Sequence, residues 1–196
     1  MAVLYRTTLV PSKLELLTAW LPRQNWYSGE PRGPSLVKVG GFRLDDPAGE
    51  VGIEFMVVRD DAADGRAYLV PMTYRGSPIA RGDAALIGTA EHGVLGRRWI
   101  YDGTRDPVLL EQLAALIQGR AGAQAQSQSN TPDATVHVNG AAAVAGVGLG
   151  ISFARLLRPA TDGAVTPGVG EVTGLWTATD GAVVRSLFAT ARPLVD

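Results

Sequence analysis

Residues 50–76 read EVGIEFMVVRDDAADGRAYLVPMTYRG, and this stretch decides the fold. Apolar side chains recur at every second position of its first half, at Val51, Ile53, Phe55 and Val57. That period is typical of a β-strand with one buried face. The short turn DAADG then leads into a second run, RAYLVPMTYRG at 66–76. Because so short a turn joins antiparallel neighbours and not parallel ones, the stretch predicts a hairpin within an antiparallel sheet.

Strands are also predicted on both sides of this hairpin. The run SLVKVGGFRL at 35–44 precedes it and is joined to it by the turn DDPAG, so the three runs form a meander. Pro71 lacks a backbone N–H and therefore predicts an edge strand or a bulge within the third run. Residues 85–103 predict two short strands or irregular segments around a glycine-rich turn. The segment AVLYRTTL at 2–9 is a further candidate strand.

Two helices are expected. In PSKLELLTAWLP, Ser12 and Glu15 have the spacing of a capping box, and Pro22 ends the helix soon after an apolar face that includes Trp20. In DPVLLEQLAALIQG, Asp106 is the expected N-cap, with proline at the first helical position and Gly119 as the C-cap.

The rest of the chain is polar and then β-rich. Residues 119–132 have low complexity and no core-forming side chain, which predicts a flexible polar linker or loop. Four further strand-like runs follow within 133–196. We therefore divide the chain into an α+β region at 1–118, the linker, and a C-terminal β-rich region that packs on the same sheet. The expected class is α+β with a mostly antiparallel sheet, two helices and additional C-terminal strands.

Composition excludes several classes of partner and chemistry. The 18 basic and 19 acidic side chains leave a net charge of −1, so we expect no binding to nucleic acid or to an anionic membrane. The chain has no cysteine, which excludes disulfides and thiolate chemistry. No stretch is long and apolar enough to span a bilayer, and the first residues lack the pattern of a signal peptide, so we expect a cytoplasmic location.

The sequence carries no catalytic constellation. Neither His92 nor His137 has a second histidine at metal-ligand spacing, and we expect no metal and no cofactor. The serines lack the GxSxG pattern of a nucleophile elbow. The glycines of GVGLGISFAR at 146–155 match no nucleotide-binding pattern and indicate a turn or a close backbone approach. A catalytic site assembled across the fold stays open, but the sequence favours a protein without enzymatic activity.

Two aromatic segments are candidate contact surfaces. In TAWLPRQNWYSGEPRG at 18–33, Trp26 and Tyr27 follow a proline and Arg23. They either close the core at the end of the helix or dock a partner, since aromatic and arginine side chains dominate interface energies. In GRRWIYDG at 96–103, Arg98 and Trp99 could bind a ligand or could form an ion pair and a core contact.

Several motifs together resemble the N-terminal cap domain of actinobacterial maltokinases. They are WLPRQNWYSG at 20–29, YLVPMTYRG at 68–76, and ALIGT at 85–89 followed by WIYDGTRDPVLLEQLAALIQG at 99–119. Their order also agrees with the family, and the resemblance covers roughly residues 3–118. The resemblance implies a curved antiparallel sheet with a helix, in a cystatin-like arrangement. In these kinases the catalytic signatures lie after the cap, and their HGDxHxxN-type loop is absent from this sequence.

The resemblance therefore implies a stand-alone, non-catalytic interaction or regulatory module of α-glucan, maltose or trehalose metabolism. Its partner would be a kinase or a glucan-metabolising enzyme, and the oligomeric state is left open. The expected contact residues are Arg23, Trp26, Tyr27 and Arg98. The alternative is a protein that binds a small ligand, a sugar or a nucleotide, on the concave face of the sheet. Its expected ligand contacts are Tyr74, Trp99 and Trp176.

Overall fold

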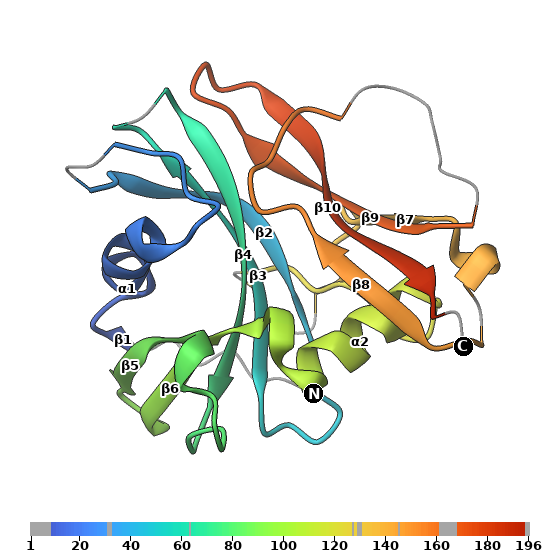
Figure 1. Ribbon diagram of the computed structural model, residues 1–196, viewed down its shortest axis with the longest axis horizontal. Helices are drawn as coiled ribbons and strands as arrows, with labels where there is room; N and C mark the ends of the chain where they lie inside the picture. The colour runs from blue at the N-terminus through green and yellow to red at the C-terminus, as the bar shows by residue number, and fades with distance from the viewer. Residues whose placement is uncertain are drawn as a thin grey trace.

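A computed structural model of the protein describes residues 9–30, 33–62, 64–126, 128, 131–144, 146–160 and 168–194 (Figure 1). Its two α-helices are α1 (Lys13–Trp20) and α2 (Pro107–Ile117). Its strands are β1 (Leu9–Val10), β2 (Leu36–Leu44), β3 (Gly52–Asp60), β4 (Arg66–Arg75), β5 (Leu86–His92), β6 (Gly96–Asp102), β7 (His137–Asn139), β8 (Leu149–Phe153), β9 (Gly170–Thr177) and β10 (Val183–Pro193). Four 3-10 turns are η1 (Leu21–Arg23), η2 (Asp83–Ala85), η3 (Gly103–Arg105) and η4 (Ala141–Val144).

The strands form one open, antiparallel sheet. Their order is β1-β5-β6-β4-β3-β2-β9-β10-β8, and β7 pairs with β9 beside β2. The expected α+β class with a mostly antiparallel sheet is confirmed, whereas the cystatin-like arrangement stays an expectation. The meander β2-β3-β4 and the hairpin β5-β6 follow the predicted runs. The candidate strand at 2–9 falls outside the described residues except for Leu9, which belongs to β1.

The N-terminal helix forms as its sequence predicts. The Ser12 hydroxyl accepts a hydrogen bond from the backbone N–H of Glu15 at 3.3 Å, and the Glu15 carboxylate accepts one from the N–H of Ser12 at 2.7 Å. These two bonds complete the capping box and satisfy orphan donors of the first turn. Leu17 and Trp20 are buried, and the chain continues through Pro22 as the turn η1. The helix thus ends where its proline predicts.

The second helix is fixed at both ends. The Asp106 carboxylate accepts a hydrogen bond from the N–H of Val108 at 3.0 Å, so Asp106 is the N-cap. At the other end Gln118 is the C-cap, and Gly119 follows it with φ +73°. The Gly119 and Arg120 N–H groups donate back to the carbonyls of Leu116 and Ala115, the pattern of a Schellman motif. Gly119 is therefore the residue just after the cap.

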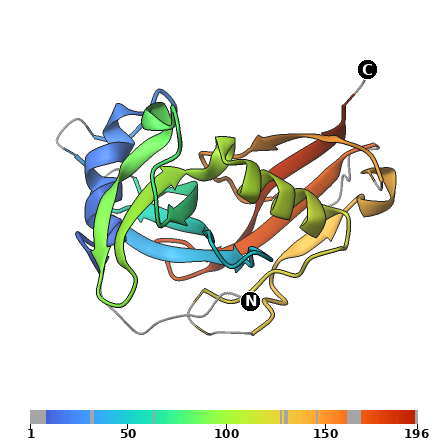
Figure 2. The same ribbon diagram turned by 90° about the horizontal axis from the view of Figure 1, so that it is seen from below.

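Strands β3 and β4 are buried on both faces. One face of the two strands packs on the side of α2 and the other face on the side of α1 (Figures 1 and 2). One core contains Phe42, Phe55, Phe188 and the apolar face of α2. The other lies against α1 and contains Leu17, Trp20, Met56, Tyr68 and Ile100. Alternate residues of β3 thus serve two cores, because successive side chains of a strand point to opposite faces.

The C-terminal strands continue the same sheet. Strand β9 pairs with β2 at Gly40–Trp176, and β10 and β8 extend the order beyond it. Between α2 and β7 the chain runs along β2, where Arg43 and Gln124 exchange two backbone hydrogen bonds of 2.9 Å. The division into regions 1–118, 119–132 and 133–196 stays a prediction.

One predicted strand is shorter than its pattern indicates. The run ATVHVNGAAAVAG at 134–146 forms a strand only at His137–Asn139. Gly140 follows with φ +70°, and a Cβ there would lie 2.0 Å from the Val169 carbonyl oxygen. This left-handed turn ends the pairing, and the alanines after it form η4.

Gly41 is required in β2, just after the bulge between Lys38 and Gly40, and we expect Gly41→Ala to lower the free energy of unfolding by about 1–3 kcal/mol. Its φ is +121°, and an added Cβ would lie 1.9 Å from the backbone oxygen of Phe55 on β3. Urea unfolding would measure the change. Gly49→Ala is the matched control, because Gly49 also has a positive φ, +72°, but open space around the new Cβ. Equal losses from the two variants would contradict a steric requirement at Gly41.

Candidate functional site

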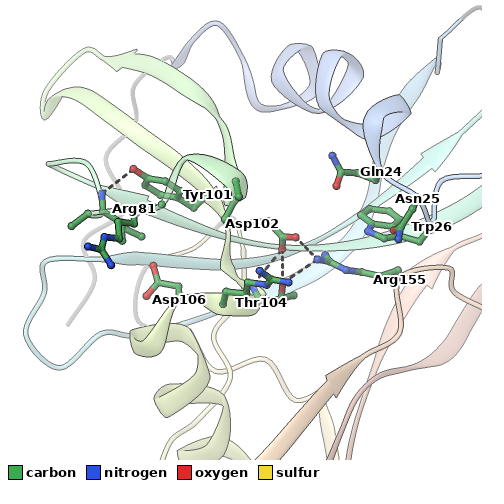
Figure 3. Close-up of a pocket in the computed structure, with 15 residues that line it drawn as sticks. Gln24, Asn25, Trp26, Arg81, Tyr101, Asp102, Thr104, Asp106 and Arg155 are labelled. Carbon is green, nitrogen blue, oxygen red and sulfur yellow. Dashed lines mark hydrogen bonds and ion pairs between the residues drawn. The ribbon is translucent and has the colours of Figure 1, made fainter.

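A cavity of about 670 Å³ lies on the side of the sheet where β6 ends (Figure 3). One wall is the segment after η1, a second wall is the loop around η2, and the third is formed by β6, η3 and Arg155. Its lining comprises Gln24, Asn25, Trp26, Ile79, Ala80, Arg81, Gly82, Ala84, Ala85, Tyr101, Asp102, Thr104, Arg105, Asp106 and Arg155. Most of these side chains are polar, so the cavity is suited to a polar ligand.

The cavity lies beside a break in the sheet at Pro71. Strand β4 is an interior strand, so the prediction of an edge strand at Pro71 is wrong. Along the edge of β4 that faces β6, the pairing with β6 begins only at Met72. Before that, residues 155–157 pair with the same edge only around Tyr68, through an isolated bridge, so Pro71 lies between the two pairings. The N–H of Leu69 donates to this side of the strand, so the ring nitrogen of Pro71 also faces it. Proline is tolerated here because no strand requires its missing donor.

Arg155 holds one wall of the cavity together. Its Nη2 forms an ion pair with Asp102 and donates to the Thr104 hydroxyl at 3.1 Å. Asp102 in turn accepts hydrogen bonds from the Thr104 backbone N–H and hydroxyl, at 3.3 and 3.1 Å. The guanidinium lies 4.8 Å from the centre of the Trp26 ring, a cation–π distance. Its Nη1 is buried and has no hydrogen-bond partner among the described residues.

Asp106 organises a second part of the lining. Its carboxylate, with a side chain 1% exposed, accepts two hydrogen bonds from Arg75 at 2.8 and 2.7 Å and one from the Thr73 hydroxyl at 2.8 Å. Burial alone would raise the pKa of Asp106, but the hydrogen bonds from Arg75 and Thr73 and the charge of Arg75 together lower it below its ordinary value of 3.8. This carboxylate is thus held ionised by its own protein partners.

Two arginines stand at the rim. Arg81 and Arg105 are both exposed, and neither side chain has a hydrogen bond or an ion pair within the part of the chain that the structure describes. Arg81 has φ +60°, which is uncommon for a residue with a side chain. Near it, the Tyr101 hydroxyl accepts a hydrogen bond from the N–H of Ile79 at 2.9 Å and fixes this loop to β6 (Figure 3).

The structure brings together only some of the predicted contact residues of segment 18–33. Trp26 is half-buried, 5.8 Å from Trp20 and 6.1 Å from Tyr68 between ring centres, and it lines the cavity. Tyr27 packs on Tyr68 and donates its hydroxyl to Asp60 at 2.8 Å. Arg23 is exposed in η1. The segment thus packs against the core and presents Trp26 at the same time.

The other predicted residues lie in separate environments. Tyr74 and Trp99 sit on neighbouring strands but on opposite faces, because their register partners are Ile100 and Arg75. Trp176 is 7% exposed and donates its indole N–H to the Ser186 hydroxyl in the core. Arg98 donates to the Leu95 carbonyl within its own hairpin. The structure therefore does not gather Tyr74, Trp99 and Trp176 on one face, and their binding roles stay predictions.

Tyr74 belongs instead to a buried ionic cluster at the start of α1. Glu54, 3% exposed, accepts hydrogen bonds from Lys13 Nζ at 2.5 Å, the Tyr74 hydroxyl at 2.7 Å and Gln126 at 3.1 Å. Burial would raise the pKa of Glu54, but the charge of Lys13 and the hydrogen bonds from Lys13 and Tyr74 lower it. Burial and Glu54 together raise the pKa of Tyr74. Every polar group of this cluster has a partner, so it is a structural network.

Sequence reasoning missed most of the cavity. Asp102, Thr104 and Arg105 lie in the quoted segment WIYDGTRDP, but nothing in their spacing indicates a shared wall. Arg155 gave no signal, because its partner Asp102 is far away in the sequence. His92 accepts local hydrogen bonds from the N–H groups of Val94 and Leu95 in a turn, and His137 is an exposed residue of β7.

Within the described ranges, no group of three or more histidine, aspartate or glutamate side chains is arranged to hold a metal ion. The same residues contain no helix with the length and apolar character needed to cross a bilayer.

Residues 20–106 match the family model of the maltokinase N-terminal cap domain. The match begins at Trp20, in the first of the motifs quoted above, and ends at the N-cap of α2. It confirms the resemblance, and the matched part of the chain is a maltokinase N-terminal cap-like module. It also contains every residue that lines the cavity except Arg155.

Proposed function

We propose that the protein is a non-catalytic docking module of maltose, α-glucan or trehalose metabolism, acting in the cytoplasm. Its partner would be a kinase or a glucan-metabolising enzyme. The match to the cap domain supports this proposal, since the cap is the part of a maltokinase that precedes the catalytic lobes. The absence of the kinase catalytic loop from the sequence agrees with a role in binding.

The observation that carries the proposal is the way Trp26 is held. Its ring contacts Trp20 and Tyr68 from the core side and the Arg155 guanidinium from the cavity side, yet Trp26 stays partly exposed. A rigid aromatic side chain at a cavity rim loses little conformational entropy on binding and is typical of an interface anchor. Arg23, three residues earlier, adds an exposed positive charge for an acidic group of the partner.

We expect Arg23→Glu to weaken partner binding by about tenfold, which corresponds to about 1.4 kcal/mol. Trp26→Ala should weaken it further, by about thirtyfold, because truncation of an anchor costs about 2 kcal/mol or more. Biolayer interferometry with the immobilised protein and a purified maltokinase or glucan-modifying enzyme would measure both affinities.

Arg192→Glu is the matched control for the charge reversal. Arg192 is an exposed residue of β10, on a strand that contributes nothing to the cavity lining. Its substitution should leave the affinity unchanged, and circular dichroism should show that each variant is folded. Wild-type affinity in both the Arg23 and the Trp26 variants would remove this surface from the interface, and no binding by the wild-type protein would contradict docking to the enzymes tested.

A further inference from the structure

We infer that the cavity bounded by Trp26, Tyr101 and Arg155 is a binding site for a small organic molecule that carries an oxyanion, a phosphate or a carboxylate. This inference goes beyond the docking function and does not depend on it. It rests on the charge balance, the hydrogen-bond balance and the size of the cavity.

The charge balance of the cavity is positive. Three arginines line it, Arg81, Arg105 and Arg155, and Arg75 contacts it through Asp106. The lining contains two carboxylates, Asp102 and Asp106, and each is already paired with an arginine. The charges of Arg81 and Arg105 are therefore not offset by a partner among the described residues. In a protein with a net charge of −1, this is a local concentration of positive charge that attracts anions.

The hydrogen-bond balance favours a ligand that accepts. Arg81 and Arg105 have no acceptor among the described residues, whereas the Arg155 guanidinium uses Nη2 for Asp102 and Thr104 and its Nη1 is buried away from the solvent of the cavity. A guanidinium can only donate, so the exposed side chains of Arg81 and Arg105 are suited to a ligand that accepts hydrogen bonds. Gln24 and Asn25 lie beside Trp26, on the same side of the cavity as Arg155, and the Gln24 amide already donates to the Trp20 carbonyl at 3.2 Å (Figure 3). A phosphate or carboxylate would supply oxygen atoms that Arg81 and Arg105 can bind, and arginine recognises both groups through its planar fork.

Arg81 is presented by an unusual backbone. Its φ is +60°. Among the described residues other than glycine, only Asp64, in the turn after β3, also has a positive φ. Left-handed backbone at a residue with a side chain costs about 1 kcal/mol or more and persists where the surroundings impose it. Here the bond from Ile79 to Tyr101 and the bond of the Gly82 N–H to the Ile79 carbonyl at 3.0 Å fix the loop. The arginine is thus held at the rim.

The size of the cavity indicates more than an inorganic ion. A volume of about 670 Å³ is within the range of sites for small organic ligands. The ring of Trp26 and the amides of the first wall offer surfaces for the uncharged part of such a molecule. The oxyanion would lie against Arg81 and Arg105, and the organic part would lie towards Trp26.

The test is isothermal titration calorimetry of the full chain at constant ionic strength with three matched probes: glycerol 3-phosphate, glycerate and glycerol. Glycerol 3-phosphate carries a phosphate and glycerate carries a carboxylate, whereas glycerol carries no oxyanion. We expect a dissociation constant of about 1 mM or lower for at least one of the two anions, and no heat of binding for glycerol at about 10 mM. The anion that binds identifies the group that the site takes. No binding of either anion, or equal binding of glycerol, would overturn the inference.

The double substitution Arg81→Gln and Arg105→Gln locates the site. Both side chains are exposed and without partners in the described structure, so the variant should fold, and it should bind the anion at least about tenfold more weakly. Arg192→Gln removes the same kind of charge from β10 and should bind like the wild-type protein. Undiminished affinity in the double variant, or an equal loss in the control, would show that the anion binds elsewhere.

Discussion

Phe55→Ala should lower the free energy of unfolding by about 3–5 kcal/mol, the cost of truncating a buried phenylalanine. Phe55 is fully buried on β3 and stacks on Phe42 of β2, with ring centres 4.3 Å apart and planes 5° from parallel. Phe42 lies in turn 6.2 Å from Phe188 of β10. The three rings join the N-terminal and C-terminal strands, so the cavity left by one ring disturbs both parts of the core.

Urea unfolding, monitored by tryptophan fluorescence, would measure this loss. An unchanged slope of the free energy of unfolding against urea concentration would show that only stability has changed. Val183→Ala is the control, because Val183 is 67% exposed and its truncation should change stability by less than about 0.5 kcal/mol. A loss below about 1.5 kcal/mol for Phe55→Ala would contradict a central role for this stack, because exchanges between apolar side chains of equal volume already cost up to about that much.

Asp106→Ala should cost a similar amount, about 3–5 kcal/mol. The substitution removes the N-cap of α2, the acceptor of the Thr73 hydroxyl and the partner of a partly buried Arg75. An arginine left without its carboxylate at such a site is an uncompensated charge, and this makes the loss larger than that of a cap alone. Chemical denaturation of the wild-type protein and the variant would give the difference.

Asp106→Asn separates the two contributions, because asparagine still caps a helix but carries no charge. The stability profile with pH gives a second check. The pKa of Asp106 is depressed in the folded state, so its contribution is present above the unfolded value of 3.8 and is lost as the pH falls below about 4. Both variants should therefore lose less stability than the wild-type protein on acidification through this range. Identical acid profiles would contradict an ionised, paired Asp106.

The helices and the meander could be predicted because their determinants are local. The capping box of Ser12, the N-cap at Asp106 and the alternation through β3 are all readable within a few residues of sequence. The predicted edge at Pro71 failed for a reason that is not local. Its missing donor is accommodated by a gap between β6 and residues 155–157, and that gap exists only once distant segments have come together.

The candidate site was predictable only in part for the same reason. Trp26 could be singled out, since aromatic and arginine side chains cluster around it in the sequence. The ion pair of Arg155 with Asp102 could not, because it joins the segment after β8 to the end of β6. The aromatic candidates Tyr74 and Trp176 have the right chemistry for a ligand, but the register of their strands places one in an ionic cluster and the other in the core.

The contact of residues 155–157 with β4 also bears on how the chain folds. Residues 155–157 follow β8, at the far end of the sheet order, and contact β4. Strand β9 pairs with β2 on the other side of the meander. The C-terminal part of the chain therefore contacts the meander at two places. Both contacts join residues that are far apart in sequence, and closing such long loops makes folding slow. We therefore expect the meander to form before β9 and β10 pack on it, so that the face with Phe42 and Phe55 is exposed to solvent during this interval. During that interval the exposed strands are open to association with other chains.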